Sequence, residues 1–132
     1  MGAWDPTAFG NDDAAEWAFE LRETDNPAGF ISAAFDRARA NEYLESADGA
    51  VIVAAAALVA TACDRTARLL PSELADWLRG RETQIKPLAS AASDALAKIN
   101  GEASELHEAW VDSDAFPEWA GLLESIADSL RV

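Results

Sequence analysis

Residues 49–63 read GAVIVAAAALVATAC, and this stretch decides the fold. After Gly49 it contains no charged residue, and Thr61 is its one clearly polar side chain. A helix that is apolar on every side has no face for water and is therefore buried. We expect a central helix over about residues 49–64, with amphipathic helices packed around it.

The composition agrees with a small helical domain. The chain has 132 residues, half of them hydrophobic, which suits one domain with one core. Many of the hydrophobic residues are alanines. The alternation of apolar and polar residues that is typical of β-strands is hard to find. The predicted fold class is all-α, a single domain over residues 1–132 with about seven helical segments.

Turn residues and apolar spacing divide the rest of the chain into the other helices. Residues 1–10 contain Pro6 and are expected to form an ordered irregular arm, held by Trp4 and Phe9. The predicted helix starts are Asn11 or Asp12, Asn26–Pro27, Pro71–Ser72, Lys86, Ser104 and Asp114–Pro117, with Ser46 or Asp48 capping the central helix.

The acidic residues gather at the two ends of the chain. The net charge is −14; residues 1–25 hold seven acids and one base, and residues 102–132 hold eight acids and one base. If the two ends meet, they form one strongly negative face. Such a face repels phosphate, so we expect no nucleic acid partner and favour a basic protein. The alternative interpretation is a surface that only maintains solubility.

These ends supply the candidate partner-binding residues. Trp4 is expected to be a partly exposed anchor beside the acids. The predicted set is Trp4, Asp5, Asp12, Asp13, Glu16, Glu105, Glu108 and Asp112.

The alternative hypothesis is that the same acidic residues form a metal site or an acid–base catalytic site. Glu105 and Glu108 share a helix face, but His107 follows Glu105 by two residues and points elsewhere. The Glu-x-x-His pairing of di-metal helical bundles is absent. We therefore predict no metal and no cofactor, and expect His107 to be a surface or capping residue.

Other catalytic patterns are also missing from the sequence. It contains no Gly-x-Ser-x-Gly motif and no phosphate-binding glycine loop. Cys63 ends the apolar stretch and is predicted to be a small buried residue. The run from Val51 to Cys63 is shorter than the roughly 20 residues that span a bilayer. Without a signal sequence, the expected location is the cytoplasm, with no membrane partner.

Two segments carry a family resemblance. MGAWDPTAFGNDDAAEW (1–17) and SELHEAW (104–110), with the later Trp119, resemble the bacterial family catalogued as domain of unknown function 4259. Its members typically open Met-Gly-x-Trp-Gly-x-Gly-x-Phe, whereas this chain has Asp5 and Thr7 at the later glycine positions. The resemblance spans essentially the whole chain and implies a compact cytosolic domain. It implies no reaction, because the family has no assigned activity.

Three classes of function fit these observations. The first is a small acidic protein-binding protein, such as an immunity or inhibitor protein that neutralises a basic interbacterial toxin. The second is a small helical enzyme with a carboxylate-lined site. The third is a structural or oligomerising module, with Trp4 or Tyr43 in its interface. We favour the first class, and we expect no enzymatic activity.

Overall fold

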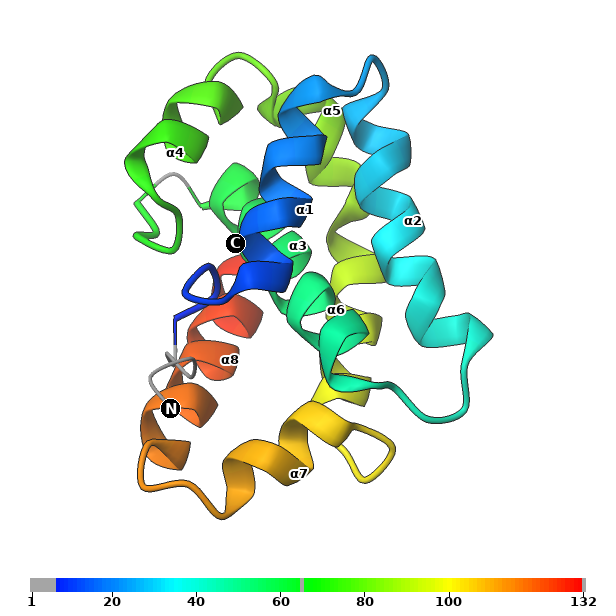
Figure 1. Ribbon diagram of the computed structural model, residues 1–132. Coiled ribbons are helices and arrows are strands. Elements are labelled where there is room, and N and C mark those ends of the chain that lie inside the picture. Colours follow the sequence, from blue (N-terminus) through cyan, green and yellow to red (C-terminus); the bar gives the residue numbers. More distant parts are fainter. Residues whose placement is uncertain (1–6, 65, 132) are drawn as a thin grey trace.

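The computed structural model describes residues 7–64 and 66–131 of the chain (Figure 1). In this part the elements are α1 (Asp12–Glu23), α2 (Pro27–Ala40), α3 (Ser46–Cys63), α4 (Ser72–Leu78), α5 (Glu82–Ile85), the 3-10 helix η1 (Lys86–Leu88), α6 (Ala89–Ile99), α7 (Glu105–Val111) and α8 (Phe116–Leu130). Because α5, η1 and α6 follow one another directly, these elements form seven helical segments. The predicted all-α bundle is confirmed.

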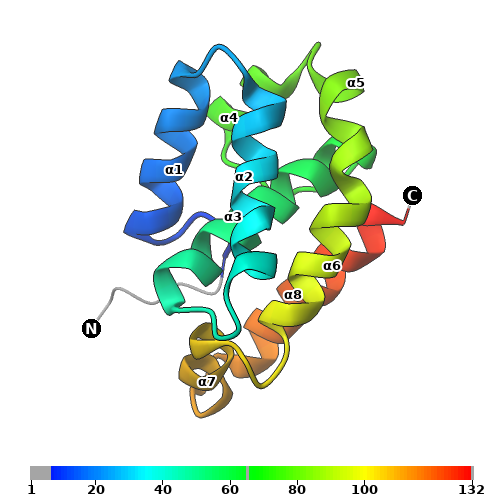
Figure 2. The same ribbon diagram turned by 90° about the vertical axis from the view of Figure 1, so that its right-hand side faces the viewer.

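Helix α3 is the centre of the bundle. It packs against α1, α2, α5, η1, α6, α7 and α8 (Figures 1 and 2). Every residue from Gly49 to Ala60 is buried, and Ala62 is buried as well. The observed helix begins three residues before the predicted start at about residue 49. The sequence pattern therefore predicted the buried central helix correctly, because no side of it can face water.

Small side chains let the other helices approach α3 closely. Ala54, Ala55, Ala56 and Ala57 form an uninterrupted run with no exposed surface. At Gly49, a Cβ atom would lie 3.1 Å from the Cβ of Leu106 on α7. That distance is shorter than ordinary van der Waals contact. The absence of a Cβ atom at Gly49 therefore allows α7 to lie close against the start of α3.

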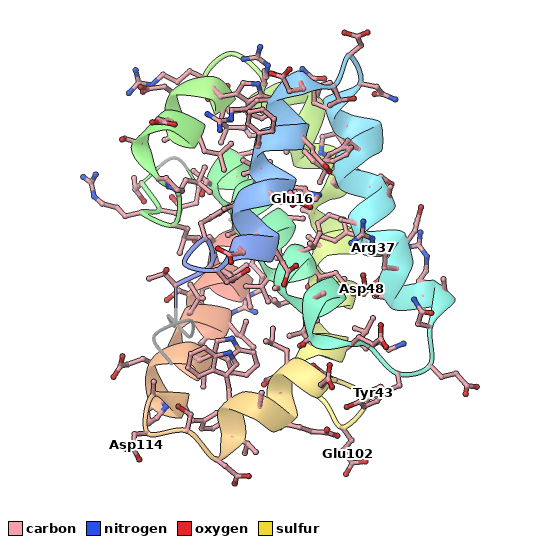
Figure 3. The ribbon with its side chains drawn as sticks, in the orientation of Figure 1. Glu16, Arg37, Tyr43, Asp48, Glu102 and Asp114 are labelled. Atoms are coloured by element: carbon pink, nitrogen blue, oxygen red, sulfur yellow. The ribbon has the colours of Figure 1, made fainter. Side chains whose placement is uncertain are left out.

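The start of α3 differs from the prediction. Glu45 occupies the N-cap position and makes no side-chain cap, so neither Ser46 nor Asp48 is the capping residue. Instead, the backbone N–H of Ser46 donates to the carboxylate of Glu105, 2.7 Å away on α7. Asp48 forms a 3.3 Å ion pair with Arg37 of α2 (Figure 3). A residue distant in sequence therefore performs the capping.

The first two helices begin as their sequences predict. The Asn11 side chain accepts a hydrogen bond from the N–H of Ala14, and the Asn26 side chain accepts one from the N–H of Gly29. Pro27 then occupies the first turn of α2. Both asparagines satisfy backbone donors that would otherwise lack a partner at a helix start.

The segment after α3 contains more helix than predicted. Pro71 rather than Ser72 occupies the cap position of α4. Gly80, with a φ of 85°, ends the α4 region as expected, because glycine adopts this left-handed conformation without strain. A helix start that was not predicted lies at Glu82, where α5 begins after Arg81. The helix predicted from about Lys86 instead begins as η1, which contains Pro87.

Most of the described tryptophans lie in the core. Trp17, Trp110 and Trp119 are buried. Trp77 is only partly buried, and the guanidinium of Arg81 lies 4.7 Å from the centre of its ring. Trp4 lies outside the described residues. Of the predicted arm, residues 7–10 are described; there Ala8 is buried and Phe9 packs on the core.

By length and composition, α3 is the helix of the described chain that could cross a membrane. It has 18 residues, more than the apolar run from Val51 to Cys63. The core helix of a globular bundle satisfies the same criterion, and 72% of α3 is buried inside the protein.

Candidate functional site

The described candidate residues fall into two groups. Asp12, Asp13 and Glu16 lie in the first turns of α1 and are exposed. Glu105 and Glu108 lie on α7, and Asp112 follows its end; all three are exposed. The other two candidates, Trp4 and Asp5, lie outside the described residues.

The local sequence of α1 explains why its acids face solvent. Its inward stripe consists of Ala14, Trp17, Ala18 and Leu21, all buried. The acids Asp12 and Asp13 occupy the first turn, where the positive end of the helix dipole favours negative charge. The remaining positions of α1 face outward.

We define the α1 outward face as Asp12, Glu16, Phe19, Glu20 and Glu23. All five side chains are exposed, and Phe19 has 59% of its surface accessible. On a helix, Glu16 and Glu23 are direct neighbours of Phe19. Within the part of the chain that the structure describes, none of the four carboxylates has an ion-pair partner. A large apolar ring thus stands among unpaired negative charges.

One base also borders this face. Arg22, three residues after Phe19, directs its guanidinium to Glu73 on α4, with an N–O distance of 3.3 Å. Because Arg22 is engaged with α4, it does not neutralise the acids of the α1 outward face by contact.

The two acids of α7 have partners within the protein. Glu105 accepts from the N–H of Ser46 at the start of α3, as described above. Glu108 accepts a 2.8 Å hydrogen bond from the hydroxyl of Tyr43. This bond, with smaller contributions from burial and from the charges of both glutamates, raises the pKa of Tyr43 to about 12. Tyr43 therefore stays protonated and acts as the donor.

Backbone bonds hold the same two segments together. The N–H of Leu44 donates to the carbonyl of Ala103 at 2.8 Å, and the N–H of Glu105 donates to the carbonyl of Leu44 at 2.9 Å. The connection between α2 and α3 is thus fixed to the start of α7. Glu105 and Glu108 support this connection, a use that their spacing on one helix face does not reveal.

The acids of α1 and those of α7 occupy different regions of the bundle. α1 packs on α2 and α3, whereas α7 packs on α3 and α8. In Figure 3, Glu16 lies on α1, whereas Glu102 and Asp114 lie at the lower end of the molecule beside α7. The α1 outward face is therefore distinct from the acids of α7.

The candidate metal or acid–base set is not assembled. Among residues 7–64 and 66–131, no group of three or more histidine, cysteine, aspartate or glutamate side chains could hold a metal ion. His107 is half-buried, and its ring centre lies 6.0 Å from that of Phe116 and 6.1 Å from that of Trp119. The ring belongs to an aromatic cluster, while the N–H of His107 donates to Ser104.

Cys63 is half-buried rather than fully buried, which corrects the prediction. It lies in the last turn of α3, where the apolar surroundings end. Burial raises the pKa of its thiol, and the charge of Lys86 opposes that effect only in part. A raised pKa leaves little thiolate at neutral pH and argues against a nucleophilic role.

A cavity of about 350 Å³ lies between the segment before α1, the segment between α3 and α4, and α8. Its lining is mostly apolar and contains no carboxylate; Arg68 is the charged residue that lines it. This cavity therefore lacks the converging acids that an acid–base enzyme of the predicted type requires.

Phe19 is an exposed aromatic residue that was not among the predicted site residues. It lies outside the apolar stripe of α1, with Glu16, Glu20 and Glu23 at neighbouring positions. That mismatch between an aromatic ring and a polar helix face is a signal that the sequence does contain.

Comparison with known proteins gives a family and no activity. No curated protein and no solved structure matches the chain. The family described as "Domain of unknown function (DUF4259)" matches residues 2–121, which is most of the chain. The protein belongs to this family of unknown function.

Proposed function

We infer that this protein is a small acidic protein-binding protein whose α1 outward face docks a basic partner protein. The observation that carries the proposal is Phe19, exposed over 59% of its surface and flanked by carboxylates that have no ion-pair partner among the described residues. Buried aromatic anchors contribute much of the affinity of protein interfaces. Surrounding charges of one sign accelerate association with a partner of the other sign.

The proposed partner has a small apolar pocket bordered by lysine and arginine side chains. Phe19 enters that pocket, and the acids of the α1 outward face pair with the surrounding bases. An immunity or inhibitor protein that neutralises a basic toxin would work in this way. The overall charge of −14 supports such a role, because it favours rapid encounter with a cationic protein.

Charge reversal on α1 tests the proposal. The variant Glu16→Lys, Glu20→Lys, Glu23→Lys is compared with the wild type in affinity capture from an extract of the cells that carry the protein. We expect the wild type to retain a basic protein at low salt and to release it as salt increases. The α1 variant is expected to retain none of that protein, as read by mass spectrometry.

The matched control reverses three other acids, Glu102→Lys, Glu118→Lys, Glu124→Lys. These side chains are also exposed, and the net charge changes by the same amount. The control is expected to retain the partner. Equal loss of the partner in both variants would mean that overall charge, and not the α1 outward face, determines binding. An α1 variant that retains the partner would contradict the proposal.

A further inference from the structure

The cavity near the N-terminal segment combines apolar walls with one charged side chain. Two half-buried leucines of the α3–α4 segment, Leu69 and Leu70, form part of its wall, and Leu122 of α8 forms another part. The complete lining is Thr7, Ala8, Phe9, Gly10, Arg68, Leu69, Leu70, Pro71 and Leu122. Small-molecule sites typically measure about 300–1,000 Å³ and combine apolar walls with a few polar groups. At about 350 Å³, this cavity falls within that range.

Three separate chain segments build this cavity. In Figure 1 the segment before α1 appears in dark blue, the segment between α3 and α4 in green, and α8 in orange to red. The α3–α4 segment is fixed at its start by Asp64, which accepts hydrogen bonds from the N–H and the hydroxyl of Thr66 and from Ser129 of α8. The pKa of Asp64 is lowered, and the hydrogen bonds from Thr66 are the main cause. The carboxylate therefore stays ionised at neutral pH and continues to accept these hydrogen bonds.

Arg68 supplies the charge at this cavity. The other arginines of the described chain each have a partner: Arg22 with Glu73, Arg37 with Asp48, Arg39 with Asp36, Arg79 with Asp76, Arg81 with Trp77, and Arg131 with Asp128. Arg68 has no hydrogen bond or ion pair to any described residue. An unpaired arginine is unexpected in a protein with 24 acids and 10 bases.

The acids nearest to Arg68 along the described chain are engaged elsewhere. Asp64 binds Thr66 and Ser129, and Glu73 pairs with Arg22. Among the described residues, none therefore engages the guanidinium of Arg68, which lines the cavity. A guanidinium binds a carboxylate through two parallel hydrogen bonds, which fixes orientation as well as charge.

We propose that this cavity binds a small carboxylic acid with an apolar tail, of the fatty acid type. The tail lies against Phe9, Leu69, Leu70 and Leu122, and its carboxylate pairs with Arg68. None of the residues of the α1 outward face lines the cavity. The two sites are therefore separate, and the ligand proposal stands independently of the proposed function.

The test is a titration of the ¹⁵N-labelled full-length protein with decanoate, kept below the concentration at which micelles form. Amide shifts report the site directly. We expect saturable shifts at Ala8, Phe9, Gly10, Leu69 and Leu70, and an affinity for decanoate about tenfold higher than for decanol, which has the same tail without the charge. A peptide with leucine at its free carboxyl terminus is expected to bind more weakly than decanoate.

Two variants isolate the role of the guanidinium. Arg68→Gln is expected to weaken decanoate binding about tenfold and to leave decanol binding unchanged. Arg39→Gln removes an exposed arginine of α2, away from the cavity, and is expected to change neither. Shifts located elsewhere, equal affinity for decanol, unchanged binding in Arg68→Gln, or tighter binding of the peptide would each overturn the proposal.

Discussion

Replacing Ala56 with aspartate is expected to unfold the protein. Ala56 lies in the middle of α3 and has no exposed surface. Burying a carboxylate without a partner costs several kcal/mol, even after the surroundings relax. The free energy of unfolding of a small domain is only about 5–15 kcal/mol, so this substitution removes most or all of it. Far-ultraviolet circular dichroism of the purified variant measures the loss of helix.

The control for Ala56→Asp is the same substitution at an exposed alanine. Ala33 of α2 faces solvent, so Ala33→Asp is expected to lower the free energy of unfolding by only about 0.5–1 kcal/mol, the cost of replacing alanine by aspartate inside a helix. An Ala56→Asp protein as helical and as stable as Ala33→Asp would show that α3 has a side open to water. The assignment of α3 as a helix buried on every side would then be wrong.

The second large effect is expected from Trp17→Ala. Trp17 is 4% exposed and stacks on Phe30 of α2, with ring centres 5.7 Å apart. Removing a buried tryptophan loses the free energy of transferring its side chain from water to the core and leaves a cavity between α1 and α2. We expect the free energy of unfolding to fall by about 3–5 kcal/mol. Urea denaturation followed by circular dichroism measures the change.

Phe19→Ala provides an internal comparison on the same helix. Its ring is mostly exposed, so its removal is expected to change the free energy of unfolding by less than about 0.5 kcal/mol. The two aromatic residues are two positions apart on α1, and the difference between them arises from burial alone. If both variants lost equal stability, the assignment of inward and outward faces on α1 would be incorrect.

Much of the fold could be predicted from local sequence. The apolar stretch after Gly49 identifies α3, and the asparagines at positions 11 and 26 mark the starts of α1 and α2 through hydrogen bonds to residues three positions later. These signals are local, because the groups that interact are close along the chain. A single sequence therefore contains them.

The features that escaped prediction depend on contacts between distant residues. The start of α3 is capped by Glu105, which lies 59 residues after Ser46. Tyr43 binds Glu108, which is 65 residues away. No spacing rule within one helix reveals such pairs, so these contacts of the two glutamates could not be predicted from the sequence. The cavity beside Arg68 could not be predicted for the same reason, because three separate segments of the chain form it.

The candidate site was predicted only in part. The spacing of the apolar stripe places Asp12 and Glu16 on the outer side of α1, where the structure also has them. Phe19 was not selected, since aromatic residues on helices are usually assigned to the core. Its exposure becomes evident only in the structure, where Trp17 and Ala18 are buried and Phe19 is 59% exposed.

The central claim is that Phe19, surrounded by the acids of the α1 outward face, anchors a basic partner. The most direct test is a calorimetric titration of the captured partner with the wild type, Phe19→Ala and Val111→Ala. Val111 is 45% exposed on α7 and serves as the control for loss of an exposed apolar side chain. We predict that Phe19→Ala raises the Kd about thirtyfold, while Val111→Ala leaves it unchanged. The same Kd for all three proteins would contradict the claim.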